Sequence, residues 1–142
     1  MERLIQGHVV VEGRAEGDAL VAREPLSFWG GYDFTTGTII DTHHALRGTR
    51  AAGRVLLVPF TKGSSTTSAV LLEAVRAGTA PAAIVTTGVD SFFALASIVA
   101  DVMYRRSFPV ISLDAEAFAS IETGDTVVVE PGGALRVTAR PR

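Results

Sequence analysis

A run of polar residues between an apolar stretch and an amphipathic stretch is where this chain could carry out chemistry. The run reads Lys62-Gly63-Ser64-Ser65-Thr66-Thr67-Ser68 and follows the apolar segment Arg54–Pro59. Backbone N–H groups at the start of a helix lack intrahelical partners and carry partial positive charge, which favours a bound carboxylate or phosphate. Gly63 would let the backbone approach such an anion closely, and Lys62 adds a full positive charge. The hydroxyl groups that follow can cap the helix, orient a ligand or accept a proton.

Three interpretations of this loop stay open from the residues alone: a plain helix start, an anion site, or a catalytic serine. Serine and threonine are preferred at helix N-caps, which favours the first. The run is not a P-loop, because the lysine precedes the glycine, and it lacks the second glycine of a Gly-x-Ser-x-Gly nucleophile elbow. A hydrolase triad would need a histidine beside Ser64. The chain offers His43 and His44, and nothing in the sequence places either of them there.

Two further groups of residues are candidates for function. Asp41, His43 and His44 could orient a substrate or Ser64, or they could be loop residues that hydrogen-bond the backbone. We expect no metal site from these three alone, because adjacent residues on an extended chain point apart. The run Phe28-Trp29-Gly30-Gly31 could be a substrate lid, a partner contact or the hydrophobic anchor of a long loop.

The rest of the chain predicts a mixed α/β arrangement that would position this loop. Gly13–Gly17 indicates a turn between two β segments, and Ser27–His44 indicates a long loop with a turn and a short strand. The β segments are expected at His8–Glu12, Asp18–Arg23, Arg54–Pro59, Ala82–Thr86, Pro109–Leu113, Thr126–Glu130 and Ala134–Thr138, the last two as a hairpin. The helices are expected at Ser68–Ala77, from an N-cap at Asp90 or Ser91 to about Tyr104, and at Asp114–Ser120. Parallel strand–helix–strand crossovers in the middle predict a single α/β domain over residues 1–142, layered β/β/α.

Composition limits the classes of partner. The chain has 142 residues, 47% of them hydrophobic and 20% charged, with a formal net charge of −2 and no basic stripe, which argues against nucleic acid as a partner. No apolar run is long enough to cross a membrane, and the N-terminus does not resemble a secretion signal, so we expect a cytoplasmic location. Without cysteine, this chain cannot hold a thiolate-bound metal or iron–sulfur cluster, although a partner chain could.

The order and spacing of several sequence blocks resemble the small subunits of the aconitase X family. These blocks are Glu16–Val21, Pro25–Asp33, Thr36–Asp41, His43–Gly48 and Lys62–Ser68. Such subunits are a separately encoded version of the aconitase swivelling domain. The resemblance therefore implies one swivelling-type domain with a barrel-like sheet.

The resemblance also implies a function. In this family the small subunit pairs with a larger subunit, as a heterodimer or higher assembly, and the larger subunit holds the iron–sulfur cluster or metal and most of the substrate. The small subunit of such a hydro-lyase supplies a serine as general base, a role that falls here on Ser64. Lys62, Gly63, Ser65 and Thr66 would then bind substrate. Relatives often have arginine where Lys62 stands, so the charge is kept but the bidentate fork is lost.

The substrate is the least determined part of this expectation. Archaeal relatives dehydrate 5-phosphomevalonate and bacterial relatives dehydrate cis-3-hydroxy-L-proline. The chain has one lysine against twelve arginines, which is not the composition of a hyperthermophile and favours the bacterial substrate. A non-catalytic anion-binding module remains the alternative outside the enzymes.

Overall fold

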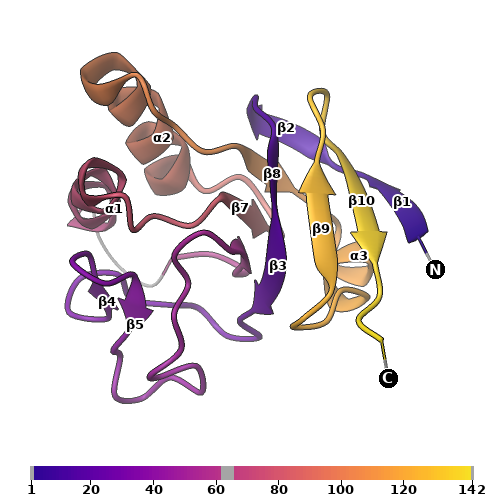
Figure 1. Cartoon of the computed structure of the whole chain (residues 1–142), viewed down its shortest axis with the longest axis horizontal. Coiled ribbons are helices and arrows are strands. Elements are labelled where there is room, and N and C mark those ends of the chain that lie inside the picture. Colours follow the sequence, from indigo (N-terminus) through magenta and orange to yellow (C-terminus); the bar gives the residue numbers. More distant parts are fainter. Residues whose placement is uncertain (1, 62–65, 142) are drawn as a thin grey trace.

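The computed structural model of the chain shows eight strands in one sheet that nearly closes into a barrel, with helices packed against it (Figure 1). It describes residues 2–61 and 66–141. The strands of this sheet are β1 (Glu2–Gln6), β2 (His8–Val11), β3 (Ala15–Val21), β6 (Val55–Leu57), β7 (Ala83–Thr86), β8 (Val110–Ser112), β9 (Thr126–Val129) and β10 (Ala134–Thr138). The helices are α1 (Thr66–Ala77), α2 (Ser91–Tyr104) and α3 (Ala115–Ala119). No helix in the described ranges is long and apolar enough to span a membrane.

Strand β3 joins a parallel layer to an antiparallel layer. Its first half pairs antiparallel with β9, from Ala15 to Asp18, and its second half pairs in parallel with β6, from Ala19 to Val21. Strands β6, β7 and β8 continue the parallel layer, and β9, β10 and β1 form the antiparallel layer. Figure 1 shows α1 and α2 on the side of the parallel strands away from β9 and β10. The expected α/β fold with β/β/α layers and a barrel-like sheet is therefore confirmed.

Alternating side chains of the parallel strands build two separate cores. Leu20, Leu56 and Ile84 point toward the helices and pack with apolar residues of α1 and α2. Their neighbours in each strand point the other way, into the space between the two β layers. Because the side-chain period of a strand is two residues, uninterrupted apolar runs such as Val55–Leu57 are what a strand covered on both faces requires.

Gly7 lies where the chain passes from one end of the sheet to the other. Strands β1 and β2 are separated by this single residue, yet they stand at opposite ends of the strand order β1-β10-β9-β3-β6-β7-β8-β2. The Gly7 N–H donates to the Gly133 carbonyl oxygen at 2.9 Å. A Cβ at Gly7 would lie 2.3 Å from Cγ2 of Ile111, so only glycine fits this corner without rearrangement. The corner brings β1 to β10 and β2 to β8.

The N-terminal region differs from the sequence analysis in two places. The stretch Gly13–Gly17 is not only a turn, because β3 already begins at Ala15 and this first half pairs with β9. Glu2–Gln6, for which no strand was expected, forms β1 through pairing with β10. Four of its five residues are exposed, so it lacks the apolar alternation that signals a strand in sequence. Pairing with β10, more than a hundred residues away, holds these residues in a strand that the local sequence pattern does not indicate.

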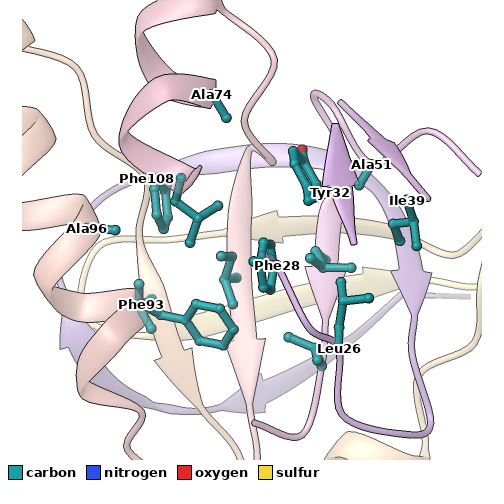
Figure 2. Close-up of a cluster of buried hydrophobic side chains, with 14 of the residues drawn as sticks. Leu26, Phe28, Tyr32, Ile39, Ala51, Ala74, Phe93, Ala96 and Phe108 are labelled. Atoms are coloured by element: carbon teal, nitrogen blue, oxygen red, sulfur yellow. The ribbon is translucent and has the colours of Figure 1, made fainter. Parts of the chain in front are cut away.

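The long segment between β3 and β6 packs its own side chains into the helix-side core. It contains two short strands, β4 (Tyr32–Asp33) and β5 (Thr38–Ile39), which pair with each other. Figure 2 shows Leu26, Phe28, Tyr32 and Ile39 from this segment gathered beside Phe93, Ala96 and Phe108. The expected loop, turn and short strand are present. This segment is thus a fixed part of the fold that lies next to the loop after β6.

Candidate active site

The loops that follow β3, β6 and β7 come together at one edge of the parallel layer. In parallel strands the carboxyl ends lie at the same edge, so residues far apart in sequence meet there. Leu26, after β3, forms an isolated parallel bridge with Thr61, after β6. The Thr87 N–H and hydroxyl, after β7, both lie within hydrogen-bond distance of the Pro59 carbonyl oxygen. This edge is where the sequence predicted chemistry.

The loop with the predicted serine connects β6 to α1. Lys62, Gly63, Ser64 and Ser65 lie outside the described residues, so the structure tests no role for them. The expected strand and helix on either side are confirmed, and α1 begins at Thr66. Its first turn contains no acidic residue, so no carboxylate of that turn offsets the partial positive charge of the helix start.

Asp90, at the end of the β7 loop, holds Thr61 immediately before the predicted site. The Thr61 N–H and the Thr61 hydroxyl donate to Oδ2 of Asp90 at 2.8 and 3.0 Å. The other carboxylate oxygen, Oδ1, accepts from the Phe92 N–H at 3.0 Å and caps α2. The expected N-cap at Asp90 is thus confirmed. The contact with Thr61 was not predicted, because it joins the ends of two neighbouring strands.

The hydroxyl groups of the predicted run divide between the loop and the helix. Ser68 and Thr67 lie in the first turn of α1 and are 7% and 1% exposed. The Ser68 hydroxyl donates to the Phe92 carbonyl oxygen at 2.9 Å, so it ties α1 to α2. Thr66, at the first helical position, is half-buried. Within the described part of the run, Thr67 and Ser68 are therefore buried parts of α1.

His44 is held by its own loop. It is 6% exposed, and its Nδ1 accepts from the Leu46 N–H at 3.0 Å. This contact requires the neutral ring to carry its proton on Nε2, which lies 3.4 Å from the carbonyl oxygen of Glu24. Both ring nitrogens thus face partners in the surrounding loops. This arrangement matches the backbone-bonding alternative considered for His44 from the sequence.

Asp41 and His43 sit beside that histidine at the surface. Oδ1 of Asp41 accepts from the His43 N–H at 3.0 Å, and the His43 side chain is exposed. Together with His44 and Glu24 they line a small cavity of about 140 Å³. Across residues 2–61 and 66–141, no group of three or more histidine, aspartate or glutamate side chains is arranged to hold a metal ion. The structure thus brings the three predicted residues together as a loop cluster.

Phe28 and Trp29, considered as one unit in the sequence, point in opposite directions. Phe28 is fully buried, with ring centroids 5.4 Å from those of both Tyr32 and Phe93. Trp29 is 69% exposed and lines a surface cavity of about 290 Å³ with Ile40 and Asp41. Gly31 allows this sharp reversal, because a Cβ there would lie 1.9 Å from the Ser27 carbonyl oxygen. The first aromatic anchors the loop and the second is available for contact.

Three exposed apolar side chains lie in the loops after β3, β6 and β7. Trp29, Phe60 and Val89 are 69%, 54% and 71% exposed, and they lie in the loops after β3, β6 and β7 respectively. Tyr32 is not available as an acid or base there. Burial raises the pKa of its hydroxyl, which donates to the Thr79 carbonyl oxygen at 2.7 Å.

Sequence reasoning missed the Asp90–Thr61 contact and the exposed Phe60 and Val89. A usable signal was present, because each of these residues follows the carboxyl end of one of two adjacent parallel strands. Applying the convergence of parallel strand ends to all loops would have placed Asp90 and Thr61 at the same edge of the sheet.

Comparison with known proteins identifies relatives of the whole domain. The family model described as the aconitase X swivel domain matches residues 4–137. The cis-3-hydroxy-L-proline dehydratase of Pseudomonas aeruginosa is 44% identical over 110 residues, which cover 78% of this chain but only 19% of that protein. The phosphomevalonate dehydratase small subunit of Methanocella arvoryzae is 37% identical over 127 residues, covering 89% of this chain and 92% of that subunit. The crystal structure of Thermococcus kodakaraensis aconitase X in its holo-form superimposes with a TM-score of 0.86 at 30% identity, covering 96% of this chain and 99% of that chain.

Proposed function

Because the chain belongs to the aconitase X swivel domain family, we propose that it is the small subunit of a hydro-lyase that dehydrates cis-3-hydroxy-L-proline. The names of its relatives support a dehydratase, and several of them are called small subunits of phosphomevalonate dehydratase. The higher identity to the Pseudomonas enzyme, 44% against 37% for the Methanocella subunit, supports hydroxyproline as the substrate. Activity then requires a larger subunit, in a complex that we place in the cytoplasm.

The observation that carries the proposal is the helix start directly after the predicted serine loop. α1 begins at Thr66 without an acidic residue in its first turn, so its N-terminus favours a negative oxygen nearby. Lys62 precedes the loop and adds a positive charge in sequence. These groups would stabilise Ser64 as an alkoxide, which is the form of serine basic enough to take a proton from carbon.

The proposed reaction is an elimination across two adjacent carbons. Ser64 takes the proton from the carbon that bears the carboxylate, and the electron pair of that C–H bond forms the new double bond. The hydroxyl group leaves from the neighbouring carbon, and with the proton it makes one water. The iron–sulfur cluster or metal that we expect on the larger subunit would supply a Lewis acid for the departing hydroxyl. On this chain, Lys62, Gly63, Ser65 and Thr66 would orient the substrate carboxylate.

Reconstitution with the larger subunit tests this function. We expect the purified 142-residue chain to fold and to show no dehydratase turnover alone. Turnover should appear when the larger subunit is added, faster with cis-3-hydroxy-L-proline than with 5-phosphomevalonate. Dehydration by the isolated chain would contradict the proposal.

The second substrate has its own support, because this chain covers 92% of the Methanocella phosphomevalonate dehydratase small subunit. Exclusive turnover of 5-phosphomevalonate in the reconstituted complex would therefore correct the substrate and keep the reaction. Binding of a carboxylate or phosphate, without turnover of either compound in the complex, would favour the non-catalytic module.

Trp29 provides a test of the partner surface. Its side chain is 69% exposed in the loop after β3, and we place it on the surface that faces the larger subunit. Trp29→Ala should weaken association by about 2 kcal/mol, roughly a 30-fold increase in Kd, which is typical of an aromatic hot spot. Isothermal titration calorimetry with the larger subunit measures this change.

Val102→Ala is a matched control for Trp29→Ala. Val102 is 79% exposed on α2, away from the loops at this edge, and its substitution should leave the affinity unchanged. Equal affinities for the wild-type chain and the folded Trp29→Ala variant would exclude Trp29 from the interface.

A further inference from the structure

The N-terminus of α2 is connected to both ends of the loop between β6 and α1. On the side that leads into the loop, the Thr61 N–H and hydroxyl donate to Oδ2 of Asp90 at 2.8 and 3.0 Å. On the side that leaves the loop, the Ser68 hydroxyl donates to the carbonyl oxygen of Phe92 at 2.9 Å. Asp90 and Phe92 are themselves linked, because Oδ1 of Asp90 accepts from the Phe92 N–H.

Capping alone does not require this arrangement. A helix N-cap needs one acceptor, and Asp90 uses Oδ1 for that purpose. Its second oxygen is directed at a different segment of the chain and accepts two hydrogen bonds there. Asp90 is 9% exposed, so water replaces these contacts poorly when they are lost. Asp114, the N-cap of α3, shows capping by a single oxygen, because its Oδ1 accepts from the Ala117 N–H at 2.7 Å.

We propose that Asp90 is a positioning residue for the dehydration, which fixes Thr61 and so sets where the loop after β6 begins. This inference rests on the proposed function, in which that loop supplies the base. Ser68 and Phe92 fix where the loop ends, so the same helix start sets both flanks. A proton transfer requires the base at hydrogen-bond distance from the substrate carbon, and a displacement of about 1 Å can cost on the order of 100-fold in rate. Asp90 acts through Thr61 and does not touch substrate.

Asp90→Asn separates the two roles of this side chain. Asparagine is as good an N-cap as aspartate, so the contact with the Phe92 N–H is kept. Its amide NH₂ would face the Thr61 N–H. Because both groups are donors, the hydrogen bond from the Thr61 N–H would be lost. In the reconstituted complex we expect kcat to fall about tenfold, with KM for the substrate within about twofold of wild type. Amide hydrogen exchange of Thr61 should accelerate in the same variant.

Asp114→Asn is the matched control, because it makes the same chemical change at the cap of α3. It should leave kcat, KM and the exchange of Thr61 unchanged. If Asp90→Asn does not fold, Asp90→Ser replaces it, since serine also caps a helix but has only one oxygen and a shorter side chain. A kcat for the Asp90 variant equal to that of Asp114→Asn, or unchanged protection of the Thr61 amide, would overturn the inference.

Ser64→Ala distinguishes failure of this inference from failure of the proposed function. If Ser64→Ala keeps wild-type turnover, the proposed base is wrong whatever the Asp90 variants show. If Ser64→Ala is inactive and Asp90→Asn is as active as wild type, the function stands and only the positioning role of Asp90 is excluded.

Discussion

Replacing Ser64 with alanine should reduce kcat of the reconstituted dehydratase by at least about 100-fold, the lower range for loss of a positioned general base. Folding should change little, because a loop hydroxyl that acts as a helix cap contributes only about 1 kcal/mol. Binding to the larger subunit should remain nearly intact for the same reason. The measurement is exchange of the substrate's α-proton with solvent deuterium in the complex. This reports proton abstraction separately from loss of the hydroxyl group.

Ser65→Ala and Ser68→Ala are the controls for the Ser64 variant. Ser68 lies in α1 and donates to Phe92, so its loss disturbs position and should cost less in kcat than loss of the base. Ser65 is expected to bind substrate, so its removal should also have the smaller effect on kcat. Exchange of the α-proton at the wild-type rate in Ser64→Ala would show that Ser64 is not the base. The loop would then be an anion cradle or a plain helix start.

Replacing Phe28 with alanine should destabilise the domain by about 3–5 kcal/mol, as expected for removal of a fully buried aromatic side chain. Phe28 is 0% exposed and lies between the rings of Tyr32 and Phe93, so its loss leaves a cavity between the long loop and α2. Domains of this kind are stable by only about 5–15 kcal/mol. The loss should therefore appear as a large drop in the urea midpoint.

Trp29→Ala is the matched control for Phe28→Ala, since it removes the adjacent aromatic side chain from an exposed site. Its free energy of unfolding should stay within about 0.5 kcal/mol of wild type. A loss of stability in Trp29→Ala as large as in Phe28→Ala would contradict the division between anchor and contact residue. Together with the affinity measured for the Trp29 variant, the pair separates folding from partner binding.

The position of the candidate loop could be predicted because its signals are local. A buried strand shows as a continuous apolar run at Val55–Leu57, and α1 shows as apolar residues at helical spacing after a hydroxyl-rich start. The N-cap at Asp90 and the closing hairpin of β9 and β10 depend likewise on short-range chemistry. Each of these features is indicated by residues within a few positions of one another.

The directions of the side chains in the long loop between β3 and β6, and the contacts they make, could not be predicted. Both depend on which neighbouring residues the fold supplies. Phe28 and Trp29 have similar hydrophobicity, and the buried one is the residue that meets Phe93 of α2. The contacts of His44 likewise depend on the fold, which places the Leu46 N–H and the Glu24 carbonyl oxygen against its two ring nitrogens. Neither outcome is encoded in the spacing of the residues concerned.

By itself the sequence determined the order of the central strands and helices, the α/β class and the place of the hydroxyl-rich loop, because periodicity and capping act over short distances. Only the tertiary structure decided how the sheet nearly closes. Strand β1 exists through its pairing with β10, and the corner at Gly7 requires a residue without a side chain. Only the fold brought Asp90 to Thr61, since parallel strands gather their carboxyl ends at one edge whatever their separation in the chain.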